Sequence, residues 1–133
     1  MKSRILIFVA VVLAIMVVAC SETDEAKEQK QVVVDAFTKL YNGDVEGYLE
    51  CVDFGHPLDS AHIAMQKLLL SSYVEEVEAR GGISEIEPTG TKFESDTVVY
   101  VYYALKYNNG TRESHFQLLE YKEGKWKMKV GLE

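Results

Sequence analysis

The chain has 133 residues, with 14 Lys and Arg residues against 21 Asp and Glu residues. This length accommodates one domain rather than two. The formal charge of −7 argues against nucleic-acid binding, because a phosphate backbone must be met by Lys and Arg side chains. The same charge argues against docking on anionic lipid by electrostatics alone.

The N-terminus has the organisation of a signal peptide. Lys2 and Arg4 precede an unbroken apolar run from Ile5 to Ala19. That run is shorter than the roughly 20 residues that a membrane-spanning helix needs. We therefore expect residues 1–19 to be a removable signal peptide. Its removal would leave a mature charge of 12 − 21 = −9.

The segment Val17-Val18-Ala19-Cys20 resembles a bacterial lipobox, which implies a diacylglyceryl group on the thiol of Cys20. Two acyl chains or more anchor a domain stably. Ser21 follows the cysteine, as in lipoproteins sent to the outer membrane, and we expect residues 20–27 to form an acidic tether. The sequence does not decide which membrane leaflet would hold the lipid. Two alternatives to lipidation stay open: a secreted protein with a free Cys20 and a single-pass membrane anchor.

Cys51 is the only cysteine besides Cys20, so no internal disulfide is expected. We interpret Cys51 as a small apolar residue, with a reactive thiol or an intermolecular bridge as the alternatives.

We expect residues 28–133 to form one domain. Its first half shows helical periodicity. A helix is expected from Ala26 to Asn42-Gly43, and a second one starts after Asp44 and stops before Gly55 and Pro57. The apolar stripe of the first helix consists of Val33, Ala36, Phe37, Leu40 and Tyr41, and that of the second of Val45, Tyr48, Leu49 and Val52. A third helix is expected from about Asp59 to Arg80. Its apolar stripe, which we expect to face the core, consists of Met65, Leu68, Leu69, Tyr73 and Val77.

The second half alternates with the period of a β-strand. Residues 83–87 predict a weak edge strand that Pro88 and Gly90 interrupt. Asn109-Gly110 predicts a two-residue hairpin loop, which would set Tyr103 opposite Phe116. Residues 122–124 predict a three-residue loop before the last strand. The expected inner face consists of Val99, Val101, Tyr103, Leu105, Phe116, Leu118, Trp126, Met128 and Val130.

These elements predict an α+β fold, with three N-terminal helices packed on one face of a curved, four-stranded, mainly antiparallel sheet. The sequence from Asp35 to Asp44, then Gly81-Gly82-Ile83, Asn109-Gly110 and Glu123-Gly124-Lys125-Trp126, resembles small bacterial lipoproteins of the nuclear transport factor 2-like superfamily. The resemblance implies a cone of curved sheet around helices, often with an internal pocket. The short segment 52–58 lacks the hairpin that closes the cone in larger members.

The expected inner face offers little for catalysis. His115 and Gln117 alternate with the inward Phe116 and Leu118, so we expect them to lie on the outer face. We therefore expect no carboxylate or imidazole inside, no catalytic residue and no cofactor. The candidate pocket residues are Tyr48, Tyr103, Phe116 and Trp126. The alternative is a small isomerase- or dehydratase-like enzyme that uses Tyr48 and Tyr103 with Asp53 or His56.

Four polar residues recur every third position: Asp53, His56, Asp59 and His62. Carboxylates and imidazoles are suitable zinc ligands. Because Gly55 and Pro57 interrupt the segment, we favour a loop followed by a helix that Asp59 caps, and we expect no metal.

The outer sheet face is expected to carry the candidate interface residues Tyr100, Tyr102, Gln117 and Leu119, beside Lys127 and Lys129. Tyrosines with a basic rim are favoured at interfaces, and the resemblance implies that dimers form through this face. We therefore expect a non-catalytic, lipid-anchored protein of the bacterial envelope. It would bind a second copy, an envelope protein or a small apolar ligand.

Overall fold

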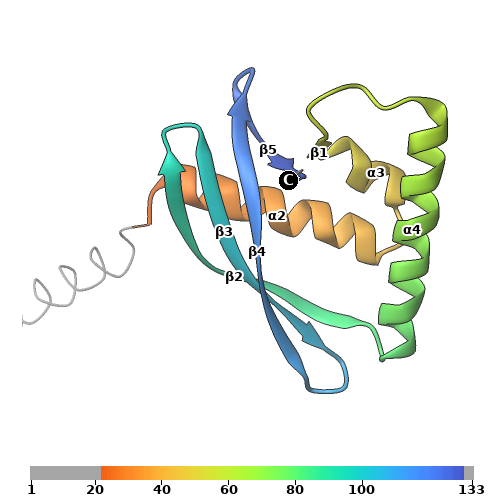
Figure 1. The fold of residues 1–133 in the computed structure, drawn as a ribbon. Helices are drawn as coiled ribbons and strands as arrows, with labels where there is room; N and C mark the ends of the chain where they lie inside the picture. The colour runs from red at the N-terminus through yellow and green to blue at the C-terminus, as the bar shows by residue number, and fades with distance from the viewer. Residues whose placement is uncertain (1–21, 131–133) are drawn as a thin grey trace, which may run out of the picture.

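The structure is a computed structural model that describes residues 22–130. Three helices and five strands follow in the order α2 (Asp24–Tyr41), α3 (Val45–Glu50), β1 (Val52–Asp53), α4 (Ser60–Ala79), β2 (Ile83–Ser95), β3 (Val98–Tyr107), β4 (Arg112–Lys122) and β5 (Lys125–Lys129) (Figure 1). The strands form one curved sheet in the order β1-β5-β4-β3-β2. The α+β expectation is confirmed.

The expected number of strands is wrong by one. Val52 and Asp53 leave the end of α3 and pair in parallel with Met128 and Lys129 of β5. A two-residue strand has no periodicity of its own, and the sequence places Val52 on the apolar stripe of the preceding helix. Only the pairing with β5 reveals it as a strand.

Helix α2 lies across the concave face of the sheet and supplies most of the helical core. Its cap, Thr23, accepts a hydrogen bond from the backbone N–H of Ala26 at 3.0 Å. The helix begins at Asp24, so residues 24–27 of the expected tether are helical. The apolar stripe is confirmed, with these side chains buried: Val33, Ala36, Phe37 and Leu40.

The expected burial of the α4 stripe is wrong. Met65, Leu68 and Leu69 are 61%, 68% and 57% exposed, and Val77 alone in the helix is buried. Helix α4 stands across the C-terminal end of α2 and reaches the core along one side (Figure 1). That side carries Leu70 and Val74, which precede Val77 by about two turns and one turn.

No helix within residues 22–130 is long and apolar enough to cross a membrane.

The β3–β4 hairpin differs from the prediction by one residue. The N–H of Tyr107 donates to the carbonyl of Thr111 at 2.9 Å, which leaves a three-residue loop, 108–110, instead of two residues. A contact with the turn after α4 holds that loop. Asn108 donates from its amide Nδ2 to Gly81 at 2.7 Å and from its backbone N–H to Gly82 at 3.0 Å.

The β4–β5 hairpin also differs by one residue, in the opposite sense. Glu123 and Gly124 both have positive φ angles, 52° and 85°, and Lys122 pairs with Lys125. The connection is thus a two-residue turn with positive φ at both positions, as in a type I′ turn, whose twist matches that of the paired strands.

Because side chains alternate between faces, a one-residue shift reverses the whole of β4. Leu119 is fully buried beside Met128, whereas Phe116 is 61% exposed. Strands β3 and β5 keep the expected orientation. The sheet's buried core side chains are Val52, Val99, Val101, Tyr103, Leu105, Tyr107, Leu119, Trp126 and Met128.

Strand β2 lies at the edge of the sheet, as predicted, but is longer than residues 83–87. Pairing with β3 continues through Pro88 and Gly90 across a register irregularity between them. An edge strand tolerates proline because the missing N–H can lie on the unpaired side.

Candidate functional site

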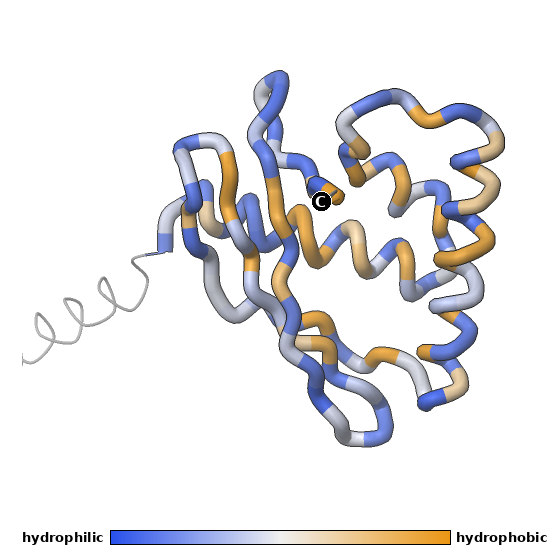
Figure 2. Tube along the Cα trace, viewed as in Figure 1, coloured by the Kyte–Doolittle hydropathy of each residue, from blue (hydrophilic) through white to orange (hydrophobic). Residues whose placement is uncertain are grey.

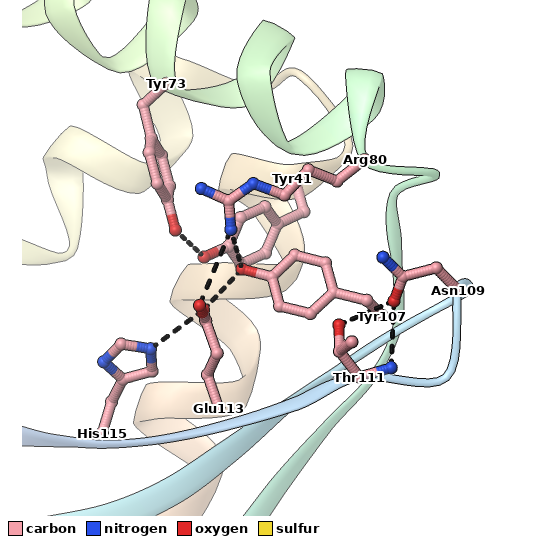
Figure 3. Close-up of polar contacts among 8 residues, drawn as sticks. All are labelled: Tyr41, Tyr73, Arg80, Tyr107, Asn109, Thr111, Glu113 and His115. Carbon is pink, nitrogen blue, oxygen red and sulfur yellow. Dashed lines mark hydrogen bonds and ion pairs between the residues drawn. The ribbon is translucent and has the colours of Figure 1, made fainter.

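Tyrosines from four elements converge where α2, α3 and α4 meet the concave face of the sheet. Tyr41 ends α2, Tyr48 lies on α3, Tyr73 lies on α4, and Tyr103 and Tyr107 lie on β3. Figure 3 shows Tyr41, Tyr73 and Tyr107 beside Arg80, Glu113 and His115. We call this group of eight residues the concave cluster.

One part of the concave cluster is an aromatic stack. The ring of Tyr103 lies between Phe37, at 5.1 Å between centroids, and His115, at 5.7 Å. Tyr48 packs against the same Phe37 at 5.6 Å. The hydroxyls of Tyr41 and Tyr73 are hydrogen-bonded at 2.8 Å, which ties α4 to α2 (Figure 3).

The other part is an ion network around Glu113 (Figure 3). The hydroxyl of Tyr107 donates to Glu113 Oε1 at 2.6 Å, and His115 Nε2 lies 3.4 Å from the same oxygen. The guanidinium of Arg80 is 3.6 Å from Glu113 Oε2 and stands 5.6 Å from the centre of the Tyr107 ring. The hydrogen bond from Tyr107, followed by the one from His115, holds the pKa of Glu113 below its usual value.

Burial disfavours the ionised form of four phenols in the concave cluster. Burial raises the pKa of Tyr48 to about 12, and burial together with the Glu113 hydrogen bond raises that of Tyr107 to about 12. Burial also raises the pKa values of Tyr41 and Tyr103. The hydroxyls of Tyr48 and Tyr103 can therefore donate hydrogen bonds to a ligand, whereas that of Tyr107 already donates to Glu113. A proton acceptor at this site would have to be Glu113 or His115.

The structure brings two of the four expected pocket residues, Tyr48 and Tyr103, into this cluster. Trp126 is buried instead between Phe93 and Tyr121, at 6.2 and 5.2 Å. The expected inward orientation of Phe116 is wrong, because the β4 register turns it to the outer face. The expectation that His115 points away from the helices is wrong for the same reason.

Sequence reasoning missed Arg80, Glu113 and His115. The signal that could have found Glu113 and His115 is the alternation of β4, whose direction depends on a hairpin length that Asn108 fixes by a tertiary contact. Arg80 lies at the end of α4, and no pattern in the sequence marks it. Tyr41 and Tyr73 appeared only as members of apolar stripes.

The outer face of the sheet carries an aromatic patch of Tyr100, Tyr102, Phe116 and Leu118. Phe116 packs edge-on against Tyr100 at 5.6 Å and lies 6.4 Å from Tyr102. Tyr102 is 39% exposed and Phe116 is 61% exposed. A hollow of about 530 Å³ adjoins the patch where β5 ends, and Tyr100, Phe116 and Leu118 contribute to its walls.

Two of the four expected interface residues, Tyr100 and Tyr102, lie in this outer patch. The placement of Gln117 and Leu119 there is wrong, since both have the concave parity of β4. The Gln117 amide donates to the carbonyls of Leu118 and Lys129 at 3.0 and 3.1 Å, which gives it a structural role at the end of β5.

The four polar residues from Asp53 to His62 are separated in the structure. Asp59 caps α4 by accepting from the N–H of His62 at 2.8 Å and contacts its ring at 2.8 Å, whereas Asp53 pairs with Lys122 at 3.1 Å. No group of three or more potential metal ligands occurs within the described part of the chain. A groove of about 590 Å³ passes Asp53 and His56 over an apolar floor of Leu49, Phe54, Leu58 and Ile63.

Cys51 is a free, half-buried thiol that lies 3.3 Å from the carbonyl of Gly47. Cys20, the expected lipidation site, lies outside the described residues.

No family model matches the chain, and no curated protein matches it. A Campylobacter jejuni protein, provisionally named an NTF2-like transpeptidase and solved by crystallography, has a similar fold. The TM-score is 0.66 at 14% identity, over 76% of this chain and 96% of that chain. At this identity the likeness concerns the fold alone. Residues 22–130 therefore have a nuclear transport factor 2-like (NTF2-like) fold.

Proposed function

We propose that this chain is a lipid-anchored protein of the bacterial envelope, held by an acylated Cys20. It binds an envelope protein through the outer patch. The observation that carries the binding role is the exposure of Phe116, 61%, in the middle of a sheet face. Solvated sheet faces ordinarily carry polar residues at such positions.

The outer patch has the composition of a protein interface. Its aromatic centre of Tyr100, Tyr102 and Phe116 is supplied by two neighbouring central strands, so it is preorganised. Charged residues surround it, with Lys129 paired to Glu120 at 3.5 Å and Arg112 paired to Glu87 at 3.1 Å. An aromatic centre inside a charged rim is the arrangement from which binding hot spots are built.

The experiment places a photo-activatable phenylalanine analogue at position 116 of the full chain, expressed in its own envelope. Ser114, exposed on the same strand and face, is the matched control position. We expect one adduct from position 116, with a mass equal to the chain plus a partner. The double variant Tyr100→Glu/Tyr102→Glu should abolish it.

An adduct of twice the chain mass would mean that the outer patch pairs two copies instead. Equal labelling from positions 114 and 116, or no adduct, would contradict the proposed binding surface. Anchoring is tested separately: radiolabelled palmitate should enter the wild-type chain and be absent from Cys20→Ser.

A second candidate is an isomerase- or dehydratase-like activity in the concave cluster, as in the alternative drawn from the sequence. The observation that favours it is His115, which stacks on Tyr103 and contacts Glu113. A phenol donor beside an imidazole and a carboxylate is a suitable set for acid–base chemistry on a carbonyl compound. Asp53 and His56, named in that alternative, line the separate groove.

A panel of small apolar enones and phenols, measured by thermal shift, tests this second candidate. Ligands of the concave cluster should raise the melting temperature of the wild-type chain. The increase should be lost in Tyr103→Phe and in His115→Gln. An equal increase in all three proteins, or none in any, would exclude a ligand site at these residues.

A further inference from the structure

The outward side of α4 carries a stripe that the fold does not use. Six residues recur at alternating intervals of four and three positions, the spacing of a helix that packs along another helix. Five of the six are apolar or small. The stripe consists of Ala61, Met65, Leu68, Ser72, Glu75 and Ala79.

This stripe lies opposite the side that holds α4 in place. Leu70, Val74 and Val77 face the core, whereas Met65 and Leu68 are 61% and 68% exposed on the other side. The first half of α4 is thus apolar on two sides, and Figure 2 shows the apolar positions gathered there, ahead of hydrophilic last turns. A helix that is apolar all round is ordinarily covered on all sides.

A membrane surface is a poor occupant for this stripe. The chain enters α2 at Asp24, and α4 stands at the opposite end of α2 (Figure 1). An 18-residue helix is about 27 Å long, so an anchor before α2 leaves α4 remote from its attachment point. The outward side of α4 also carries Glu75, which an anionic lipid surface would repel.

We infer that the outward stripe of α4 binds the same stripe of a second copy, with the two helices antiparallel about a two-fold axis near Leu68. Leu68 then meets its own counterpart at the axis. Met65 meets the small Ser72, and Ala61 meets Glu75. On either side of the axis, large residues face small ones, as close helix packing requires.

Charge selects the antiparallel orientation. The first turn of α4 contains no acidic residue, whereas its last turns contain Glu75, Glu76 and Glu78. The N-terminal end of a helix carries a partial positive charge. An antiparallel pair therefore brings each acidic end to an end with one carboxylate, the cap Asp59, which the N–H and ring of His62 already engage. A parallel pair would set the same three carboxylates against each other.

The interface repeats one patch on both copies, as a two-fold symmetric dimer requires. It is centred on a single 20-residue helix of about 30 Å, so the association should be weak in dilute solution. A shared membrane would raise the effective concentration and favour pairing. The inference is independent of the outer patch, because α4 and the outer sheet face are separate surfaces.

Engineered cysteines in the full chain, expressed in the envelope, test the pairing and its register. Four variants in a Cys51→Ser background each carry one introduced cysteine besides Cys20, at Met65, Leu68, Ser72 or Glu75. The Cys51→Ser parent is the matched control for thiols elsewhere in the chain. Mild oxidation is followed by non-reducing electrophoresis.

We expect a covalent dimer from position 68, at about ten times the yield from positions 65, 72 and 75, since a disulfide needs Cα atoms within roughly 7 Å. In the antiparallel register, the two copies of residue 65 are offset by six residues, or about 9 Å along the axis. Comparable dimers from positions 65, 68 and 72 would indicate a parallel pair and overturn the inference. A product of any other mass, or no product above the parent, would overturn pairing with a second copy.

All four positions are exposed, so the variants should fold as the parent does, and equal protein abundance checks this. Leu68→Glu adds a second readout. It would place two carboxylates at the two-fold axis and abolish the covalent dimer from Met65→Cys/Ser72→Cys, whose two cysteines face each other across the antiparallel contact. Unchanged cross-linking in the presence of Leu68→Glu would also contradict the inference.

Discussion

Helices α2 and α4 are similar in length, yet they contribute differently to the fold. Helix α2 is the more polar of the two but buries Val33, Ala36, Phe37 and Leu40, whereas α4 buries Val77 alone. A single well-aligned stripe on α2 meets the concave sheet. The apolar residues of α4 surround the helix, and only one side meets the core. Burial thus follows the alignment of a stripe with the sheet, not the apolar content of a helix.

The largest contrast should come from truncating one apolar residue in each helix. Phe37 is 7% exposed and contacts Tyr41, Tyr48 and Tyr103, so Phe37→Ala should lower the free energy of unfolding by about 3–5 kcal/mol. Leu68→Ala, at 68% exposure, should change it by less than about 0.5 kcal/mol. Urea denaturation of both variants measures the difference. Equal losses would mean that α4 packs more deeply than described.

Alkali should weaken the concave cluster, which joins the two helices to the sheet. Burial raises the pKa of Tyr48 to about 12 from 10.0, so the folded state favours the neutral phenol. This stabilisation amounts to at most about 3 kcal/mol. It is complete below pH 10 and is lost as the pH rises through about 12. Tyrosinate absorbance follows the transition. Tyr48→Phe should move the unfolding midpoint to higher pH, and a lower midpoint would contradict the assignment.

Val77 tests whether α4 has any core contact that matters. Its side chain is 1% exposed, and Val77→Ala removes two methyl groups, which should cost about 2 kcal/mol. Val74→Ala, from a half-buried position one turn earlier, should cost less. Thermal unfolding ranks the two variants. The reverse order would place the contact line of α4 on a different side.

Gln29 is the exception within α2. Its side chain is fully buried, and its amide nitrogen and oxygen have no hydrogen-bond partner in the described part of the chain. A buried unsatisfied amide costs about 1–3 kcal/mol, so Gln29→Met should stabilise the protein by about 1 kcal/mol. Gln31→Met, two positions further along the helix and exposed, is the control. A loss of stability in Gln29→Met alone would mean that the amide is satisfied.

The smallest expected effect concerns the hydroxyl pair between α2 and α4. Tyr73→Phe removes the 2.8 Å hydrogen bond to Tyr41 and should cost about 1 kcal/mol. A cycle with Tyr41→Phe isolates the interaction, because the double variant should lose little more than either single one. Additive losses would show that the two hydroxyls act independently.

The local elements follow from the sequence because their causes are local. Asp44 and Asp59 cap the second and third helices by accepting hydrogen bonds from the backbone N–H groups three positions on, as their positions predict. The stripe from Val33 to Leu40 and the alternation of β3 and β5 likewise identify buried residues correctly. Each of these signals lies within a few neighbouring residues.

The candidate sites depend on contacts between distant segments. Alternation shows that Glu113, His115 and Gln117 share one face of β4, but the hairpin decides which face that is. Asn108 bonds to Gly81 and Gly82, 27 and 26 positions earlier, and sets the loop at three residues. This contact moves His115 to the concave cluster and Phe116 to the outer patch.

The sequence by itself determined the order of helices, the strands from residue 83 on and the orientation of β3 and β5. The β3–β4 loop is one residue longer than predicted, and the β4–β5 loop is one residue shorter. The two differences cancel for β5, so only β4 has its two faces exchanged. The tertiary structure alone decided the face of β4, the short strand β1 and the exposure of α4. Periodicity identifies the residues that share a side, whereas the packing of distant segments decides what that side meets.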